Sequence, residues 1–232
     1  MIELYNKQIS EINSGLYYGI DLGTTFTVVA SVDISEKGSN PGHLPVKLIT
    51  IQQHSPLEFD GSDKSEMIAS IIGVDKQNNM YVGNKLYRLK GHPDFEKDRN
   101  LFYHWKLDLG ISQKPLYKKA VRADLDDASK VAGKILNYCR VNILDAESEW
   151  KNVIVTVPAS FQANQRNDVM KAIEYARIKR DEQMLIDEPN AAFIGYLNDS
   201  TDEEKALLFD SGNNHILIID FGGGTCDLSV LK

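Results

Sequence analysis

The sequence predicts an α/β fold in which helices flank a mixed five-stranded sheet. Residues 16–33 and 216–230 share one pattern: an apolar strand ends in a single aspartate, a glycine-rich turn follows, and a second strand leaves the turn. Between them, segments with apolar residues at three- and four-residue spacing alternate with short β-branched runs, which is typical of βαβ crossovers. Antiparallel hairpins joined to such crossovers give a ribonuclease H-like core.

The first half of the chain is expected to be mainly β-structure. Residues 1–15 are expected to be a disordered or tag-like lead-in, because they are polar and precede the first strand pattern. The hairpin over 16–33 comes next, and a loop rich in Gly, Ser, Asn and Pro follows it. Further strands are predicted over 46–52, 66–74 and 80–83, with a turn over 75–79 and a more polar, partly helical region over 84–109.

The second half is expected to alternate helices and strands before the second hairpin. Residues 198–214 are expected to be a hairpin-like or disordered connection to that hairpin. We assign residues 16–50 and 124–232 to the core of one lobe and residues from about 51 to 123 to a smaller inserted α+β subdomain. The predicted elements are a helix from Asp124 to Ile143, a buried strand over 153–157, a helix from Gln162, a strand over 184–186 and a helix over 190–196.

Composition and charge exclude several classes of protein. The chain has 232 residues, of which 42% are hydrophobic, as in an ordinary globular protein. A net charge of -7 and a pI of about 5.3 argue against a nucleic-acid partner. The sequence holds neither an apolar segment long enough to span a membrane nor a signal-peptide pattern, so a cytoplasmic location is expected. Cys139 and Cys226 lack metal-ligand spacing and are expected to be free thiols.

The two glycine-rich turns have the chemistry of a phosphate-binding site. Turns without bulky side chains present backbone N–H groups to an anion, and threonine hydroxyls add further donors. Magnesium prefers oxygen ligands and keeps several of its waters, so the aspartate before each turn is suited to hold it largely through water. The simpler alternative is that each aspartate caps its own turn. The candidate residues are Gly23, Thr24, Thr25, Gly222, Gly223, Gly224 and Thr225 for phosphate, and Asp21 and Asp220 for magnesium.

Four segments, in order along the chain, resemble the 70-kDa heat-shock chaperone family, within the actin and sugar-kinase superfamily. One Asp-Gly-Thr turn alone is a weak signal, whereas four ordered motifs across most of the chain are a strong one. The resemblance implies the first lobe of an actin-type ATPase domain that binds ATP or ADP together with magnesium. The segments are residues 19–25 (GIDLGTT), 155–161 (VTVPASF) with Gln165 and Arg166, 187–192 (DEPNAA) and 220–227 (DFGGGTCD).

The resemblance also implies roles for individual residues. It places Glu188 near the magnesium and the attacking water, although a carboxylate at this position also stabilises a helix N-terminus. Asp227 either orients that water or is simply a polar residue of the strand. Lys106 stands where the family has a lysine that reaches the γ-phosphate, but its neighbours depart from the family pattern, and a solvated lysine is the alternative. Pro158 and Arg166 resemble the family's relay between the nucleotide state and the substrate domain; the alternatives are a strand terminator and a surface cation.

The resemblance further implies that the chain is a fragment of a longer protein. The second lobe, which would hold adenine and ribose, and the peptide-binding domain are expected to be absent from this chain, so the fragment alone is expected to hydrolyse little or no ATP. In the intact protein the expected partners are nucleotide, unfolded client peptides and co-chaperones, with no nucleic acid and no membrane. Two alternatives stay open: a phosphotransferase lobe of the sugar or acetate kinase type, and a non-catalytic scaffold that binds nucleotide or a partner.

Overall fold

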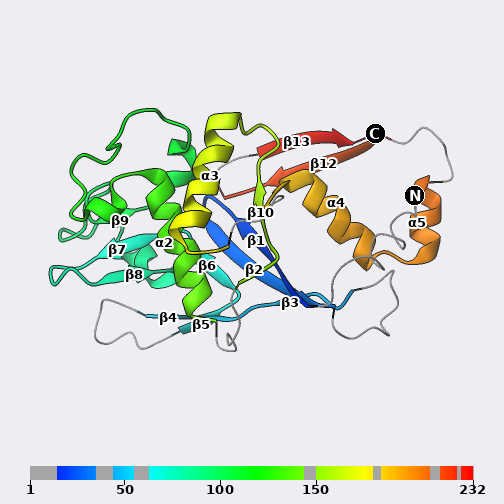
Figure 1. The fold of residues 1–232 in the computed structure, drawn as a ribbon, viewed down its shortest axis with the longest axis horizontal. Coiled ribbons are helices and arrows are strands. Elements are labelled where there is room, and N and C mark those ends of the chain that lie inside the picture. Colours follow the sequence, from blue (N-terminus) through cyan, green and yellow to red (C-terminus); the bar gives the residue numbers. More distant parts are fainter. Residues whose placement is uncertain are drawn as a thin grey trace.

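A mixed sheet forms the centre of the computed structural model, which describes residues 15–34, 44–54, 63–143, 150–179, 184–209, 215–223 and 226–231. Its strands follow the order β11-β10-β1-β2-β3, and β6 also pairs with β2 (Figure 1). The bounds are β1 Leu16–Leu22, β2 Phe26–Asp33, β3 Lys47–Leu48, β6 Met67–Ala69, β10 Val153–Val157 and β11 Leu185–Asp187.

The directions of the strands confirm a mixed sheet. β1 runs antiparallel to β2 and parallel to β10, and β10 runs parallel to β11. β3 and β6 pair with different parts of β2, β3 at Ala30 and Ser31 and β6 at residues 26–28. The sheet therefore has one short strand more than the five predicted, because the chain returns twice to the same edge.

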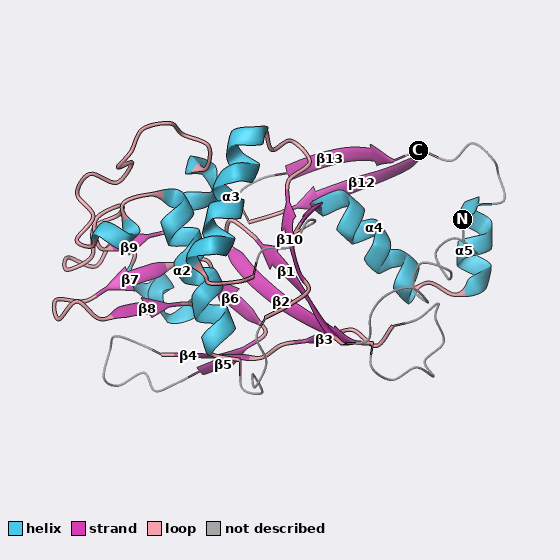
Figure 2. Cartoon of the chain, viewed as in Figure 1, coloured by secondary structure: helices cyan, strands magenta, loops and turns pink. Residues whose placement is uncertain are grey.

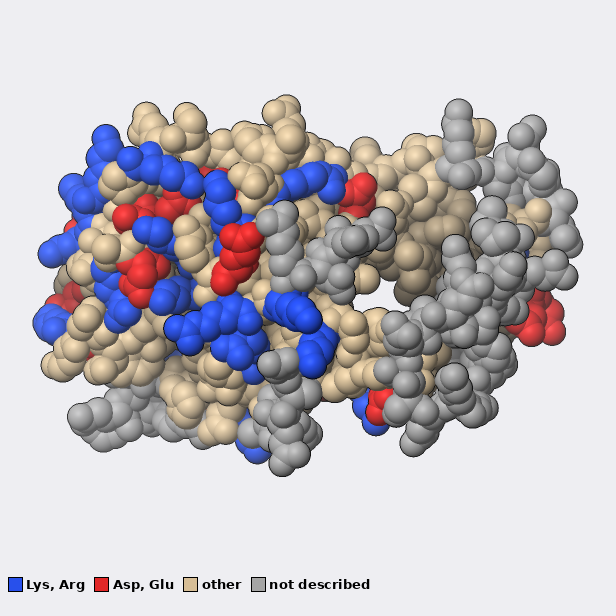
Figure 3. Space-filling model, in the orientation of Figure 1, with Lys and Arg blue, Asp and Glu red and all other residues tan. Residues whose placement is uncertain are grey.

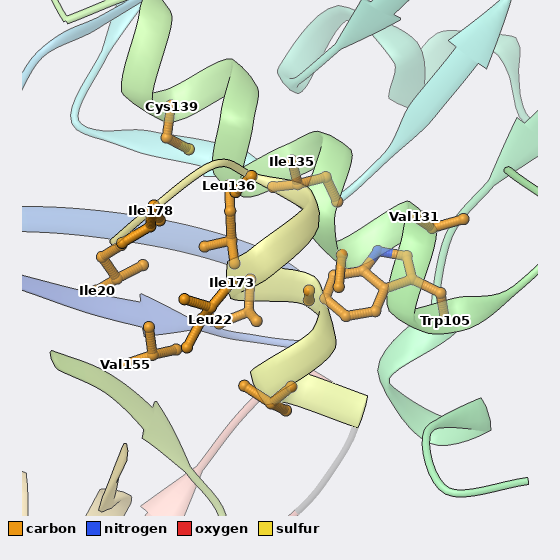
Figure 4. Close-up of a cluster of buried hydrophobic side chains, with 14 of the residues drawn as sticks. Ile20, Leu22, Trp105, Val131, Ile135, Leu136, Cys139, Val155, Ile173 and Ile178 are labelled. Carbon is orange, nitrogen blue, oxygen red and sulfur yellow. The ribbon is translucent and has the colours of Figure 1, made fainter. Parts of the chain in front are cut away.

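Two helices cover one face of this sheet and enclose the main core. α2 (Ala128–Val141) and α3 (Ala163–Tyr175) lie side by side in Figure 1. α2 begins four residues after the predicted start, because the Asp127 side chain caps it by accepting the Ser129 N–H, while residues 123–125 form a separate 3₁₀ turn. Figure 4 shows the apolar side chains that meet here, among them Ile20, Leu22, Ile135, Leu136, Val155 and Ile173, all fully buried.

Two predicted strands of the first half are each divided where the chain changes its pairing partner. The strand predicted over 46–52 becomes β3 and β4 (Ile51–Gln53), because β3 pairs with β2 whereas β4 pairs with β5 (Asp63–Ser65). The strand predicted over 66–74 becomes β6 and β7 (Ile72–Val74), which pair with β2 and with β8 (Met80–Val82). β9 (Leu101–Phe102) adds a third strand beside β7, and 3₁₀ helices cover Asn84–Leu89 and Trp105–Asp108.

The last quarter contains a helix that the sequence did not lead us to expect. α4 (Glu188–Asp199) follows β11, and α5 (Asp202–Phe209) lies within the connection predicted to be hairpin-like or disordered (Figure 2). A capping box begins α5: Thr201 Oγ1 accepts the Glu204 N–H, and the Glu204 carboxylate accepts the Thr201 N–H. The predicted second hairpin is confirmed as β12 (Ile216–Phe221) and β13 (Cys226–Leu231).

Several expectations fall outside the described residues or concern the surface. The lead-in up to residue 14, the loop over 35–43 and the turn residues Gly224 and Thr225 lie outside the described ranges.

Both cysteines are free thiols, as predicted, Cys139 buried and Cys226 exposed. None of the helices in the described ranges has the length and apolar character needed to cross a bilayer. Acidic side chains lie among the basic ones in Figure 3, and ion pairs such as that of Lys134 with Asp124, at 2.6 Å, join the two kinds.

Gly133 and Gly195 make a matched test of how closely α2 and α3 pack. Alanine is about 1 kcal/mol better than glycine inside a helix. At Gly133, however, a Cβ would lie 2.5 Å from the Tyr175 Cβ and 3.0 Å from the Ala172 carbonyl oxygen of α3, whereas at Gly195 of α4 it would meet nothing within 4 Å. We expect Gly133→Ala to lower the free energy of unfolding by roughly 1–3 kcal/mol and Gly195→Ala to raise it by about 1 kcal/mol, as measured by urea denaturation. Equal stabilisation by both changes would contradict this packing.

Candidate functional site

The two glycine-rich turns approach each other closely at one end of the sheet. A Cβ on Gly223 would lie 2.2 Å from Thr25 Oγ1, so a larger residue at position 223 would push the turns apart. Thr25 Oγ1 is buried and has no hydrogen-bond partner among the described residues. A buried hydroxyl without a partner costs free energy unless something binds it. The two turns are therefore in contact, and one buried hydroxyl beside the contact is left without a partner among the described residues.

Ser70, which the sequence did not single out, fixes the shape of the first turn. Its hydroxyl donates to the Gly23 carbonyl at 2.7 Å, and its backbone N–H donates to the Thr25 carbonyl at 2.8 Å. Ser70 is fully buried and lies between β6 and β7, where the chain changes pairing partner. Its position inside a segment predicted as one continuous strand gave no sign of this contact.

Three carboxylates project from strand ends and a hairpin beside the turns. Asp21 is exposed near the end of β1, and the Thr156 hydroxyl of the neighbouring parallel strand β10 donates to its Oδ1 at 3.0 Å. Asp220 and Asp227 face each other in register across β12 and β13. Because parallel strands bring their carboxyl ends to the same edge, Thr156 could have been placed beside Asp21 from the topology, although the sequence alone did not suggest it.

Lys106 and Glu188 form an ion pair that is almost closed to solvent. The Lys106 Nζ lies 2.8 Å from Glu188 Oε1, and the two side chains are 7% and 15% exposed. Lys106 belongs to the 3₁₀ helix Trp105–Asp108, and Glu188 is the first residue of α4. A solvated Lys106, the alternative left open by the sequence, is wrong because the side chain is buried against a residue 82 positions away.

The environment of Glu188 raises its pKa. Burial is the largest cause, the charges of Asp21 and Asp220 add to it, and the Lys106 ammonium acts in the opposite direction. The charges of both turn aspartates therefore act on the Glu188 carboxyl, together with that of Lys106. Lys106, Glu188, Asp21 and Asp220 accordingly form one electrostatic group.

A cavity of about 250 Å³ opens beside this group. Such a volume is large enough for several water molecules, each of which occupies about 30 Å³ in the liquid. It is lined by Ala159, Ser160, Glu188, Pro189, Ile218, Asp220, Asp227, Leu228 and Ser229. The cavity thus brings Asp227, from the second hairpin, to the same space as Glu188.

The remaining predicted site residues differ in their surroundings. Pro158 is buried directly after β10. Arg166 of α3 donates from Nε to the Phe161 carbonyl and from Nη2 to Asp187, the residue before Glu188, so it is an anchored side chain that is 31% exposed. Gly222 and Gly223 are exposed in the second turn.

Comparison with known proteins gives the same family over most of the chain. The family model described as Hsp70 protein matches residues 85–232. The chain is 27% identical to chaperone protein dnaK1 of Prochlorococcus marinus subsp. pastoris, covering 94% of this chain and 31% of that protein. It is 28% identical to chaperone protein HscA of Buchnera aphidicola subsp. Baizongia pistaciae (97% and 40%) and 29% identical to the HscA homolog of Shewanella putrefaciens (94% and 32%).

These relatives are much longer than the present sequence. The chain spans about a third of the length of the curated relatives it matches, while nearly all of it aligns with them. The family model matches well over half of the chain and includes Lys106, Glu188 and the whole second hairpin. The chain therefore belongs to the Hsp70 protein family.

Proposed function

We propose that this chain is the phosphate-binding lobe of an ATP-hydrolysing chaperone of the 70-kDa heat-shock type. The observation that carries the proposal is the buried Lys106–Glu188 ion pair, held within electrostatic reach of the aspartates of both glycine-rich turns. Triphosphate hydrolysis depends mainly on positioned charges and hydrogen-bond donors. Charged side chains and hydrogen-bond donors both lie at this end of the sheet.

The phosphates of ATP would bind where the two turns meet. Gly23, Thr24 and Thr25 would present backbone N–H groups from one side, and the turn from Gly222 to Thr225 would do so from the other. The Thr25 hydroxyl supports an anion at this place, because it is buried and has no hydrogen-bond partner among the described residues. Lys106, released in part from Glu188, would reach the terminal phosphate.

Magnesium would be held by Asp21 and Asp220 largely through water. Within the described ranges, no three His, Cys, Asp or Glu side chains lie close enough together to bind a metal ion directly. Water would therefore complete the six oxygen ligands that magnesium requires. When bound, the ion would neutralise charge that develops on the phosphates.

Glu188 and Asp227 are suited to handle the attacking water. A carboxylate whose pKa is raised is a stronger base than an ordinary one, so Glu188 can accept a proton more readily. Asp227 faces the same cavity and would orient the water through a hydrogen bond. Arg166 links α3 to Asp187, next to Glu188, and Pro158 follows β10, which supports a role for both in relaying the nucleotide state.

The rest of the proposal concerns the longer protein. A second lobe would supply the adenosine side of the site and, beyond it, a domain for client peptides, so turnover by the present chain alone would be low. We assign residues 16–50 and 124–232 to the lobe core and about 51–123 to the inserted subdomain, and place the protein in the cytoplasm.

Removing the Lys106 charge should make stability depend on pH. Below about pH 4.5, the ordinary pKa of a glutamate, Glu188 is protonated in both the folded and the unfolded chain. As pH rises, Glu188 loses this proton in the unfolded chain before it does so in the folded chain. Without the Lys106 charge, the pKa of Glu188 in the folded chain is higher still, so folded Lys106→Met keeps the proton to a higher pH than the folded unmodified chain. The free energy of unfolding of Lys106→Met should therefore fall further with pH, by about 1.4 kcal/mol per unit of additional pKa shift. Urea denaturation between pH 5 and 8 measures this.

Glu188→Gln provides the control for this pH dependence. Added to Lys106→Met, it removes the titrating group, so the extra pH dependence should disappear. A stability difference between Lys106→Met and the unmodified chain that stays constant from pH 5 to 8 would contradict the ion pair.

Steady-state ATP hydrolysis by the longer protein tests the proposed function. Lys106→Ala is expected to lower kcat by roughly 100-fold, as loss of one stabilising donor does in other enzymes, while Lys118→Ala, at an exposed lysine of the same region, should leave it unchanged. Equal rates for the two variants would contradict the role of Lys106. Transfer of the phosphate to a sugar instead of to water, or turnover that client peptides do not stimulate, would contradict the chaperone assignment.

A further inference from the structure

The 3₁₀ helix that carries Lys106 is fixed on both sides by side chains from other elements. On its N-terminal side, Trp105 is buried in the core (Figure 4) and its Nε1 donates to the Ser70 carbonyl at 3.0 Å. Ser70 is also the residue that shapes the first glycine-rich turn. The N-terminal anchor thus connects Lys106 to the candidate phosphate site.

The C-terminal anchor comes from α3. The Gly110 N–H donates to Asp168 Oδ2 at 2.9 Å, and the Gly110 carbonyl accepts from Asn164 Nδ2 at 2.8 Å. Gly110 has φ +83, and a Cβ there would lie 2.6 Å from the Gln165 side chain and 2.7 Å from the Asn164 Nδ2. The backbone N–H and carbonyl of Gly110 therefore both bind side chains of α3. The positive φ and the close contacts require glycine at this position.

Contacts to both carboxylate oxygens hold the Asp168 side chain in place. Its side chain is 8% exposed, and its second oxygen, Oδ1, lies 2.7 Å from Lys171 Nζ and 3.9 Å from Lys114 Nζ. Lys114 also pairs with Asp127, the N-cap residue of α2, at 3.3 Å. A nearly buried carboxylate with a backbone donor on one oxygen and cations on the other keeps its orientation.

The same turns of α3 also hold the other member of the ion pair. Arg166, two residues before Asp168, binds Asp187, which precedes Glu188. The Phe161 ring, just before α3, lies 5.8 Å from Lys106 Nζ. Gly110, close to Lys106 in the chain, and Asp187, next to Glu188, are therefore both held by side chains of α3.

We propose that Asp168, with Asn164, is a positioning residue that sets the approach of Lys106 to Glu188 through the Gly110 backbone. This inference rests on the proposed function for its catalytic meaning, because it concerns the same ion pair. The geometry itself does not depend on ATP. Loss of Asp168 would free the C-terminal end of the 3₁₀ helix and let the Lys106 ammonium move away from the carboxylate.

A coupling measurement separates positioning from general stabilisation. The coupling free energy between Lys106 and Glu188 is obtained from the stabilities of the unmodified chain, Lys106→Met, Glu188→Gln and the double variant. The four are measured by urea denaturation and then repeated with Asp168→Ala added. We expect the coupling to fall to less than half of its original value. If Asp168 only stabilised the fold, all four stabilities would fall equally and the coupling would not change, which would overturn the proposal.

Lys171→Met is the matched control, because it removes a cation from Asp168 Oδ1 but leaves the Oδ2 bond to Gly110. It should leave the coupling unchanged, and an equal loss with Lys171→Met would overturn the role of the Gly110 bond. If Asp168→Ala does not fold, Asn164→Ala, at an exposed side chain, removes the other bond to Gly110 and should lower the coupling in the same direction; an unchanged coupling in that variant would also overturn the proposal. Failure here leaves the proposed function standing if Lys106→Ala still lowers kcat as expected above.

Discussion

The buried ion pair between Lys106 and Glu188 is the interaction on which the candidate site depends. It joins the 3₁₀ helix Trp105–Asp108 to the start of α4, two regions 82 residues apart, in a place nearly closed to water. A buried pair is worth little to stability compared with an apolar contact, but breaking one partner leaves an uncompensated charge. Its value here is best understood as specificity: it holds a cation against a carboxylate whose pKa is raised by burial and by the charges of Asp21 and Asp220.

The sheet explains why these groups meet. β1, β10 and β11 run parallel, so Asp21, Thr156 and the start of α4 all lie toward one edge. The second hairpin comes to the same edge, with Gly223 against Thr25. One face of this hairpin is exposed along its length, with Leu217, Ile219 and Phe221 of β12 beside Leu228 and Val230 of β13. The order of the elements along the chain brings the candidate site residues to one edge of the sheet. Close contacts between single residues then set their positions.

Local pattern was enough to predict much of this arrangement, and the errors have physical causes. The first hairpin and the apolar stripes of α2 and α3 follow from periodicity, because one face of each is buried. β10 follows from its β-branched run, and the second hairpin from two apolar segments around a glycine-rich turn. The division of strands at Ser70 could not be predicted, since a change of pairing partner leaves no mark on alternation. α5 was missed although its capping box was readable at Thr201 and Glu204, because no residue of the helix is buried. The burial of Lys106 could not be predicted, because its partner Glu188 lies 82 residues away and no local pattern connects the two.

The central claim is that the two turns bind the phosphates of a nucleotide beside the ion pair, and amide chemical shifts measured during titration with magnesium ATP test it most directly. The account predicts that the largest shifts belong to the amides of residues 23–25 and 222–223, with smaller shifts at Lys106 and Glu188 and none at β7 and β8. A titration in which the turn amides do not move, or in which the shifts gather on β7 and β8 instead, would contradict it.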